Sequence, residues 1–180
     1  MLLLGLLPVS VALASEQADI NYYAISGSTT KQLLASMEEK GPADNTGRRF
    51  HGYTRWHVSW TYDASAQQDG CVIDKVDTEV SGTITLPEWT DASTADGALR
   101  ARWLRYSQVL REHEEGHFRF AQAAAADIRR QLGGFSSGQD CKAMYKEANR
   151  LAQQILREHQ QRERAYDRET QHGRTQGLVL

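Results

Sequence analysis

Hydrophobic and polar residues alternate in two long segments of the first half of the chain, and this pattern predicts β-strands. In residues 49–62 (RFHGYTRWHVSWTY), one face carries polar side chains while the other, with Trp56 and Val58, is hydrophobic and suited to a core. A polar turn leads to a second segment, residues 71–86, in which we expect a break at Ser81–Gly82. The two segments predict an antiparallel hairpin or meander.

The segment that precedes the hairpin predicts a short strand followed by a short helix. Residues 20–25 (INYYAI) are rich in the β-branched and aromatic side chains that favour strands. Thr29 provides a cap for a helix over residues 31–39, and Gly41–Pro42 ends it. We therefore expect a small, mostly antiparallel sheet in the first half of the chain.

The second half of the chain has helical periodicity. Between residues 96 and 132, hydrophobic side chains recur every three or four positions, which predicts one long helix or two abutting helices. Gly133–Gly134 ends this pattern, and another helix is expected from Cys141 to about Tyr166. Strands followed by helices indicate the α+β class, in a single domain over residues 15–180.

The first fourteen residues, MLLLGLLPVSVALA, have the composition of a signal peptide. The apolar run is too short to span a bilayer and ends in Ala12-Leu13-Ala14, a pattern that signal peptidase cleaves. We expect residues 1–14 to be removed, which leaves a periplasmic or secreted protein without a stable membrane span. The basic residues that usually precede such a run are missing, which suggests that the true start of the protein lies upstream. The alternative to a signal peptide is a buried N-terminal helix or an uncleaved anchor.

The charge balance bears on the possible partners of the protein, and its cysteine content bears on the compartment in which it acts. The chain has 21 Lys and Arg against 23 Asp and Glu, interleaved rather than clustered, which gives no reason to expect a nucleic-acid partner. Its two cysteines, Cys71 and Cys141, favour a disulfide in an exported protein. The alternative is a pair of soft metal ligands, although neither cysteine has a second one nearby.

The string His113-Glu114-Glu115-Gly116-His117 matches HExxH in the middle of the long predicted helix. Four residues span just over one helical turn, so both imidazoles emerge on one face and can hold one zinc ion. Glu114 lies beside them as the general base for the water that zinc activates. The alternative is two histidines packed on an ordinary helix. Gly116 argues against it, because a mid-helix glycine costs about 1 kcal/mol relative to alanine and serves to allow a close approach.

A catalytic zinc site needs a third protein ligand. The favoured residue is His172 in the string YDRETQHG, where the helical pattern ends and a glycine permits a turn; Asp167 is the alternative. A chain that turns back there would set both residues and Tyr166 over the metal, with Tyr166 as an oxyanion donor. The remaining histidines are expected at the surface: His51, His57 and His159.

These strings together resemble the bacterial family of predicted secreted zinc-dependent proteases known as DUF922. The resemblance covers most of the mature chain and includes YYAISGST, GYTRWHVSWTY, TLPEW, RWLRYSQVLREHEEGHFRFA, YDRETQHG and both cysteines. HEEGH and YDRETQHG are its specific parts. It implies that Cys71 pairs with Cys141, and it implies functional roles for His113, Glu114, His117, Tyr166, Asp167 and His172.

The sequence as a whole predicts a zincin-like α+β protein, a zinc-dependent peptidase that acts outside the cytoplasm with one zinc ion per chain. Its substrate would be a peptide or protein, paired in extended form with a strand at the sheet edge beside the metal. Two alternatives share the zinc ion: an amidase acting on cell-wall peptides, and a non-catalytic extracytoplasmic binding or assembly module. Glu114 favours an enzyme, because a structural zinc site has no use for a carboxylate at that position.

Overall fold

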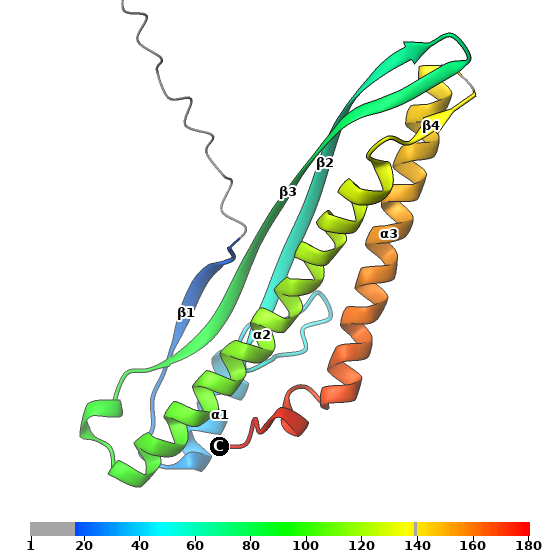
Figure 1. The fold of residues 1–180 in the computed structure, drawn as a ribbon. Helices are drawn as coiled ribbons and strands as arrows, with labels where there is room; N and C mark the ends of the chain where they lie inside the picture. Colours follow the sequence, from blue (N-terminus) through cyan, green and yellow to red (C-terminus); the bar gives the residue numbers. More distant parts are fainter. Residues whose placement is uncertain (1–16, 139) are drawn as a thin grey trace, which may run out of the picture.

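The computed structural model describes residues 17–138 and 140–180, which form a long sheet with two long helices packed along it (Figure 1). The α+β class is confirmed, whereas the signal-peptide prediction lies outside the described residues. No helix among the described residues is both long and apolar enough to cross a membrane. The strands and main helices are, in chain order, β1 (Asp19–Ile25), α1 (Thr30–Lys40), β2 (Tyr53–Gln67), β3 (Gly70–Trp89), α2 (Gly97–Leu132), β4 (Ser136–Ser137) and α3 (Cys141–Thr170).

The sheet is mixed, with the strand order β1-β3-β2 and with β4 paired to the beginning of β3. β2 and β3 form the predicted antiparallel hairpin, paired from Tyr53 opposite Thr85 to Gln67 opposite Gly70, with a register shift between Asp63 and Ala64. β1 runs parallel to β3, with Asp19 opposite Thr83. The prediction of a mostly antiparallel sheet therefore holds for the hairpin and for β4 but not for β1. β2 is an edge strand, and this position matters for the site described below.

The expected break at Ser81–Gly82 is wrong, because β3 continues through both residues. Gly82 lies opposite Trp56 in the hairpin, and the ring of Phe118 on α2 lies directly against it. A Cβ atom on residue 82 would be 2.7 Å from Phe118 Cε2. This glycine therefore serves the close approach of α2 to the sheet rather than a bend in the strand.

α2 is one uninterrupted helix of 36 residues and forms the central support of the fold. The Asp96 side chain caps it by accepting hydrogen bonds from the backbone N–H groups of Ala98 and Leu99, at 2.9 and 3.2 Å. Its buried stripe packs against the hydrophobic face of β2 and β3 and includes Leu99, Trp103, Tyr106, Leu110, Phe118, Ile128 and Leu132. The other face of the hairpin carries exposed polar side chains, such as those of Arg55 and His57.

α3 packs along α2 and continues one turn beyond the predicted end, to Thr170. Asp140 caps its first turn by accepting a hydrogen bond from the Ala143 N–H group at 2.9 Å. The buried residues of both helices include alanines, which allow the helix axes to lie close together: Ala121, Ala124, Ala125, Ala148 and Ala152. The additional turn keeps Asp167 in the helix, on the side that faces α2.

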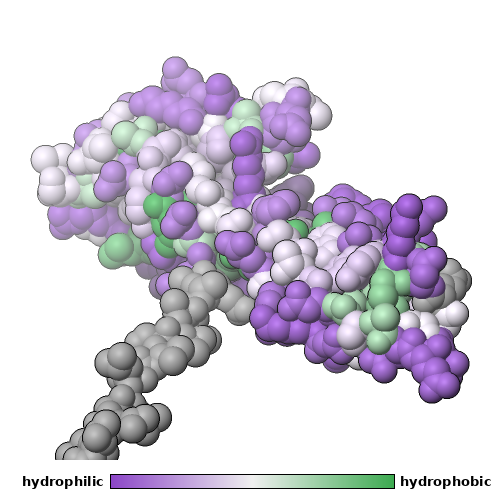
Figure 2. Space-filling model, turned by 90° about the horizontal axis from the view of Figure 1, so that it is seen from above, coloured by the Kyte–Doolittle hydropathy of each residue, from purple (hydrophilic) through white to green (hydrophobic). Residues whose placement is uncertain are grey.

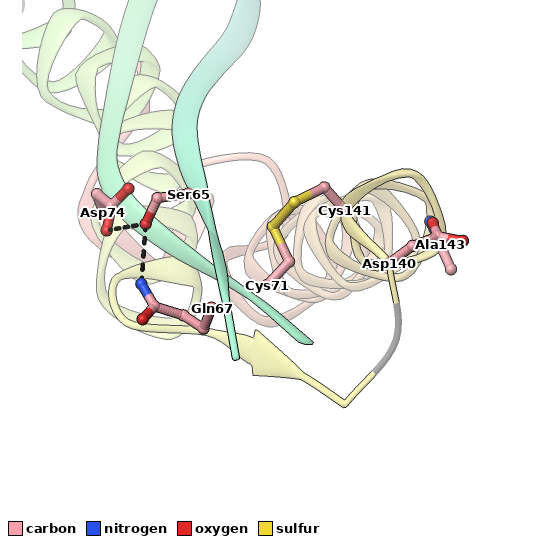
Figure 3. The surroundings of a disulfide bond; sticks show 7 residues. All are labelled: Ser65, Gln67, Cys71, Asp74, Asp140, Cys141 and Ala143. Carbon is pink, nitrogen blue, oxygen red and sulfur yellow. Dashed lines mark hydrogen bonds between the residues drawn. A yellow bond between two sulfur atoms is a disulfide. The ribbon is translucent and has the colours of Figure 1, made fainter. Parts of the chain in front are cut away.

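The two cysteines form the predicted disulfide at the end of the molecule opposite the C-terminus (Figures 1 and 3). Cys71 is the second residue of β3 and Cys141 the first residue of α3, so the bond ties the hairpin tip to the start of the last helix. Beside it, Ser65 donates a hydrogen bond to Asp74 across the hairpin at 3.1 Å. The bond fixes the two ends of a segment that contains all of α2.

We expect reduction of this disulfide to lower the free energy of unfolding by about 4 kcal/mol in the chain-entropy model, since it closes a loop of 70 residues. The measurement is denaturant unfolding of the oxidised and reduced protein. A Cys71→Ala, Cys141→Ala double variant provides the control, because it should match the reduced protein and be insensitive to reductant. Equal stability of the oxidised and reduced forms would contradict this prediction.

Seen from above, the surface is mostly hydrophilic with small, separate hydrophobic patches (Figure 2). Among the described residues, the large hydrophobic side chains that are exposed come from different elements: Tyr22, Leu104 and Val179. Such scattered positions are ordinary for a protein surface and do not indicate a docking face.

Candidate metal centre

His113 and His117 emerge from the same face of α2 in its middle turns, as their spacing predicts. Both are buried, with exposed fractions of 3% and 9%. Their Nε2 atoms lie 3.3 Å apart and point to a common position. Each imidazole therefore directs its Nε2 atom to the position that a shared metal ion would occupy.

Asp167 of α3 completes a group of three donors with these histidines. Its Oδ1 atom lies 3.3 Å from the Nε2 atom of His113 and 3.3 Å from that of His117. His172, the favoured third ligand in the sequence analysis, lies farther out, with about half of its side chain exposed. Its Nδ1 atom contacts the same Asp167 oxygen at 3.3 Å. The geometry therefore favours Asp167, the alternative, as the third donor.

The three donors fit a tetrahedral zinc ion in their chemistry and in their spacing. Two imidazole nitrogens and a carboxylate oxygen form one of the common ligand sets of catalytic zinc. Zinc bonds of 2.0–2.1 Å in a tetrahedron require donor atoms about 3.3–3.4 Å apart. The three donor–donor distances are each 3.3 Å, so little movement is needed to hold the ion.

The outward nitrogens of the two imidazoles are held by polar side chains. His113 Nδ1 lies 2.9 Å from Oε1 of Gln176, and His117 Nδ1 lies 3.2 Å from Oε1 of Glu163. Glu163 is fixed in turn by the Trp56 indole, which donates to it at 2.9 Å. An N–H group donated at Nδ1 leaves the Nε2 lone pair free for a metal, the usual arrangement around zinc-bound histidines.

The sequence analysis did not identify either of these partners. Glu163 carries a weak signal, because it precedes Asp167 by four residues and so shares its face of the helix. Gln176 follows the last recognised string and carries no signal of its own. Only the fold brings it back to α2.

A tight turn after α3 returns the chain to the metal centre. Gln171, His172 and Gly173 have φ angles of 50, 53 and 84°, three successive left-handed conformations. Gly173 is needed both for this conformation and for space, since a Cβ atom there would lie 3.0 Å from Leu178 Cδ2 and 3.4 Å from His113 Cγ. The turn therefore explains the glycine of YDRETQHG and places the following residues over His113.

Glu114 is buried beside the three donors, with an exposed fraction of 5%. Thr54 of β2 donates its hydroxyl to Glu114 Oε2 at 2.8 Å. Gly52 makes room for the carboxylate, because a Cβ atom there would lie 2.7 Å from Glu114 Oε1. Burial raises the pKa of Glu114 above its ordinary value, while nearby His117 and the Thr54 hydrogen bond oppose that rise. The result is a positioned carboxylate with increased proton affinity.

The electrostatics of the donors suit a cation. Burial lowers the pKa of His117, but hydrogen bonds to Asp167 and Glu163 outweigh this and raise it to about 10. Burial raises the pKa of Asp167, but hydrogen bonds from His113 and His117 overcome that effect and hold it well below its ordinary value. Carboxylates thus stabilise positive charge at the centre of the site.

Tyr166 packs behind His113 instead of lining the cavity at the metal centre. Its ring stacks on that imidazole, with centroids 5.0 Å apart and 17° between the planes. Its hydroxyl accepts a hydrogen bond from Gln176 Nε2 at 3.0 Å. A Cβ atom on Gly116 would clash with this ring, at 2.8 Å from Cζ. Gly116 thus leaves space for the Tyr166 side chain rather than for a backbone or a substrate. The oxyanion role of Tyr166 stays a prediction, and these contacts do not favour it.

The donors open into a cavity of about 670 Å³. One wall comes from Arg48 to Thr54, the segment that leads into edge strand β2, and the other from the end of α3 with His172 and Leu178. Glu114 and the three donors lie along it. The beginning of the edge strand therefore borders the same cavity as the candidate metal donors.

Of the three other histidines, all of which we expected at the surface, two are buried or half-buried. His57 is exposed, as expected. His51 is half-buried, with Nδ1 at 2.5 Å from the Tyr106 hydroxyl, and burial lowers its pKa. His159 is 3% exposed, and its Nε2 atom lies 2.9 Å from Asp127 of α2. The prediction failed for His159 because its charged sequence neighbours occupy the outer face of α3 while His159 itself faces α2.

Fold and site together define an α+β protein with a candidate mononuclear metal centre, built from HExxH and an aspartate of a second helix. The chain belongs to the DUF922 family, described as a bacterial protein of unknown function, which matches residues 20–173. No curated protein and no solved structure matches the chain. The family description states no activity, so a function has to be argued from the site.

Gln176 lies beyond the residues that match the family, and we expect it to support metal binding. Gln176→Leu should weaken zinc binding by about 10- to 100-fold, because His113 loses the acceptor that fixes its ring. Competition for zinc between the apo-protein and a chelator measures this. Gln176→Glu should restore much of the affinity, and Gln161→Leu, at an exposed position of α3, is the control. Unchanged affinity in Gln176→Leu would rule out the orienting role.

Proposed function

We propose that this protein is a zinc-dependent peptidase. The observation that supports it most strongly is the buried Glu114 carboxylate beside three donors with zinc-like spacing, all within one open cavity. A purely structural zinc site has four protein ligands and no need for an adjacent buried carboxylate. Three donors leave one coordination position for a reactant.

The residues of the site have distinct roles in this proposal. His113, His117 and Asp167 hold the ion, which when bound activates water and polarises a carbonyl group. Glu114 accepts a proton from the attacking water and delivers it to the leaving amine. Thr54 holds the Glu114 carboxylate in place through its hydroxyl. The raised pKa of Glu114 suits both proton transfers.

The arrangement of the sheet supports a peptide as the substrate. β2 is an edge strand, and Tyr53 and Thr54 at its beginning line the cavity with the donors. An extended peptide can add to such an edge through backbone hydrogen bonds and present a bond to the metal. An edge strand beside an HExxH helix supports the zincin-like fold that we propose for this protein.

The proposed location is outside the cytoplasm. The Cys71–Cys141 disulfide supports it, because such bonds persist in oxidising compartments and are rare in the cytosol. An exported peptidase would act on secreted, periplasmic or cell-wall peptides.

The test is metal analysis combined with digestion of a mixed peptide library. We expect about one zinc ion per chain, cleavage of a subset of the peptides, loss of cleavage on chelation and recovery when zinc is returned. The chelated protein before zinc addition is the matched control. Stoichiometric zinc with no cleavage of any peptide would contradict the peptidase and favour a non-catalytic zinc module.

A further inference from the structure

Three arginines line the same cavity as the metal donors. Arg48 and Arg49 precede β2 on one wall, and Arg164 lies on α3 on the other. Arg164 directly follows Glu163, the residue that holds His117, and precedes Asp167 by three positions. Positive side chains therefore border the donors from two separate elements.

The carboxylates of this cavity are already committed to other groups. Asp44 accepts hydrogen bonds from the Thr46 hydroxyl, the Thr46 N–H group and the Arg48 N–H group at 2.6, 2.8 and 3.1 Å. These bonds, that of the Thr46 hydroxyl most of all, and the nearby charge of Arg48 lower the pKa of Asp44. Glu163 accepts from Trp56 and contacts His117, and Glu114 accepts from Thr54. Asp167 belongs to the donor triangle described above.

None of the three guanidinium groups forms a salt bridge within residues 17–138 and 140–180, although the charge of Arg48 acts on nearby Asp44. Arg48 lies over the Phe50 ring, 5.0 Å from its centroid, and Arg49 donates to the Gly41 carbonyl at 2.6 Å. Neither contact neutralises a charge. Positive charge that no salt bridge neutralises, as at Arg49 and Arg164, attracts anionic ligands to a concave site.

We propose that Arg164, together with Arg48 and Arg49, binds a carboxylate of the substrate, so that the site selects peptides with a negative charge near the scissile bond. Arginine is suited to this role, because its planar guanidinium group binds a carboxylate through two parallel hydrogen bonds. The carboxylate can come from an Asp or Glu side chain or from the free C-terminus of the peptide. The inference rests on the proposed peptidase function and adds the class of substrate.

Binding of fluorescent peptides to the zinc-loaded Glu114→Gln protein tests this selection without hydrolysis. The peptides form matched sets in which Glu is exchanged for Gln, and a free C-terminus for an amide. We expect the negatively charged peptides to bind about tenfold more tightly than their neutral partners, with a preference that declines as salt is added. The set in which the preference occurs identifies the source of the carboxylate.

Arginine variants assign the preference to the cavity. Arg164→Gln and Arg48→Gln should each reduce it to about twofold or less, whereas Arg162→Gln, an exposed position on α3 outside the cavity, should leave it unchanged. Equal affinity for charged and neutral peptides would overturn the inference. So would a preference that survives both cavity variants.

Failure of carboxylate recognition and failure of the proposed peptidase function give different results. Selective binding without cleavage by the wild-type protein would contradict the peptidase and leave carboxylate recognition intact. Cleavage of neutral and acidic peptides at equal rates would do the reverse. Zinc content and circular dichroism of each variant confirm that its metal centre and fold are retained.

Discussion

Replacing Asp167 with Ala is expected to lower zinc affinity by roughly 10²-fold or more, whereas His172→Ala should lower it by less than about tenfold. The first variant removes one of three donors. A protein zinc site binds its ion with a free energy of about 10–16 kcal/mol in total, so each ligand contributes roughly 3 kcal/mol or more. The second removes a half-exposed side chain whose Nδ1 atom lies 3.3 Å from Asp167 Oδ1 and which is not one of the three grouped donors. Titration of each apo-variant with zinc against a competing chelator gives both values.

Glu169→Ala is the matched control for this pair, because it removes an exposed carboxylate from the same turn of α3. It should bind zinc like the wild type. If His172→Ala loses zinc and Asp167→Ala retains it, the third ligand is an imidazole, and the His172 side chain must turn inward when metal binds. His113→Ala and His117→Ala should lose zinc in either case, since both donors lie in the triangle.

Glu114→Gln should reduce the turnover of cleaved peptides by about 10²- to 10⁴-fold while the protein keeps its zinc. The amide preserves the shape of the side chain but cannot accept and return a proton, and general acid–base catalysis contributes an effect of this size. The measurement is kcat on a peptide that the wild type cleaves, with zinc content determined in parallel. Glu112→Gln, at an exposed position of the same helix, is the control and should retain full activity.

A second variant separates the position of the Glu114 carboxylate from its chemistry. Thr54→Val removes the hydroxyl that donates to Glu114 Oε2 and keeps the volume of the side chain. We expect about a tenfold loss of turnover, between the wild type and Glu114→Gln, because the carboxylate remains but is less well held. Full activity of Glu114→Gln in zinc-loaded protein would exclude this residue as the general base.

The sequence determined those features that depend on residues close together in the chain. The alternation in the hairpin and the three- to four-residue period in α2 specified their faces, because each pattern follows the geometry of one element. The same local rule placed His113 and His117 on one helical face and Glu114 beside them. The disulfide was also predictable, since only two cysteines are available in the chain.

The tertiary structure alone decided which distant residues complete the centre. Asp167 and His172 are both close to the end of α3, and the choice between them depends on one additional helical turn and on the left-handed turn after it. Glu163 and Gln176 meet the histidines across 46 and 63 residues of chain. The burial of His159 and the parallel pairing of β1 with β3 likewise arise only when elements pack together. Periodicity within one element carries no information on such contacts, because they depend on the relative position of several elements.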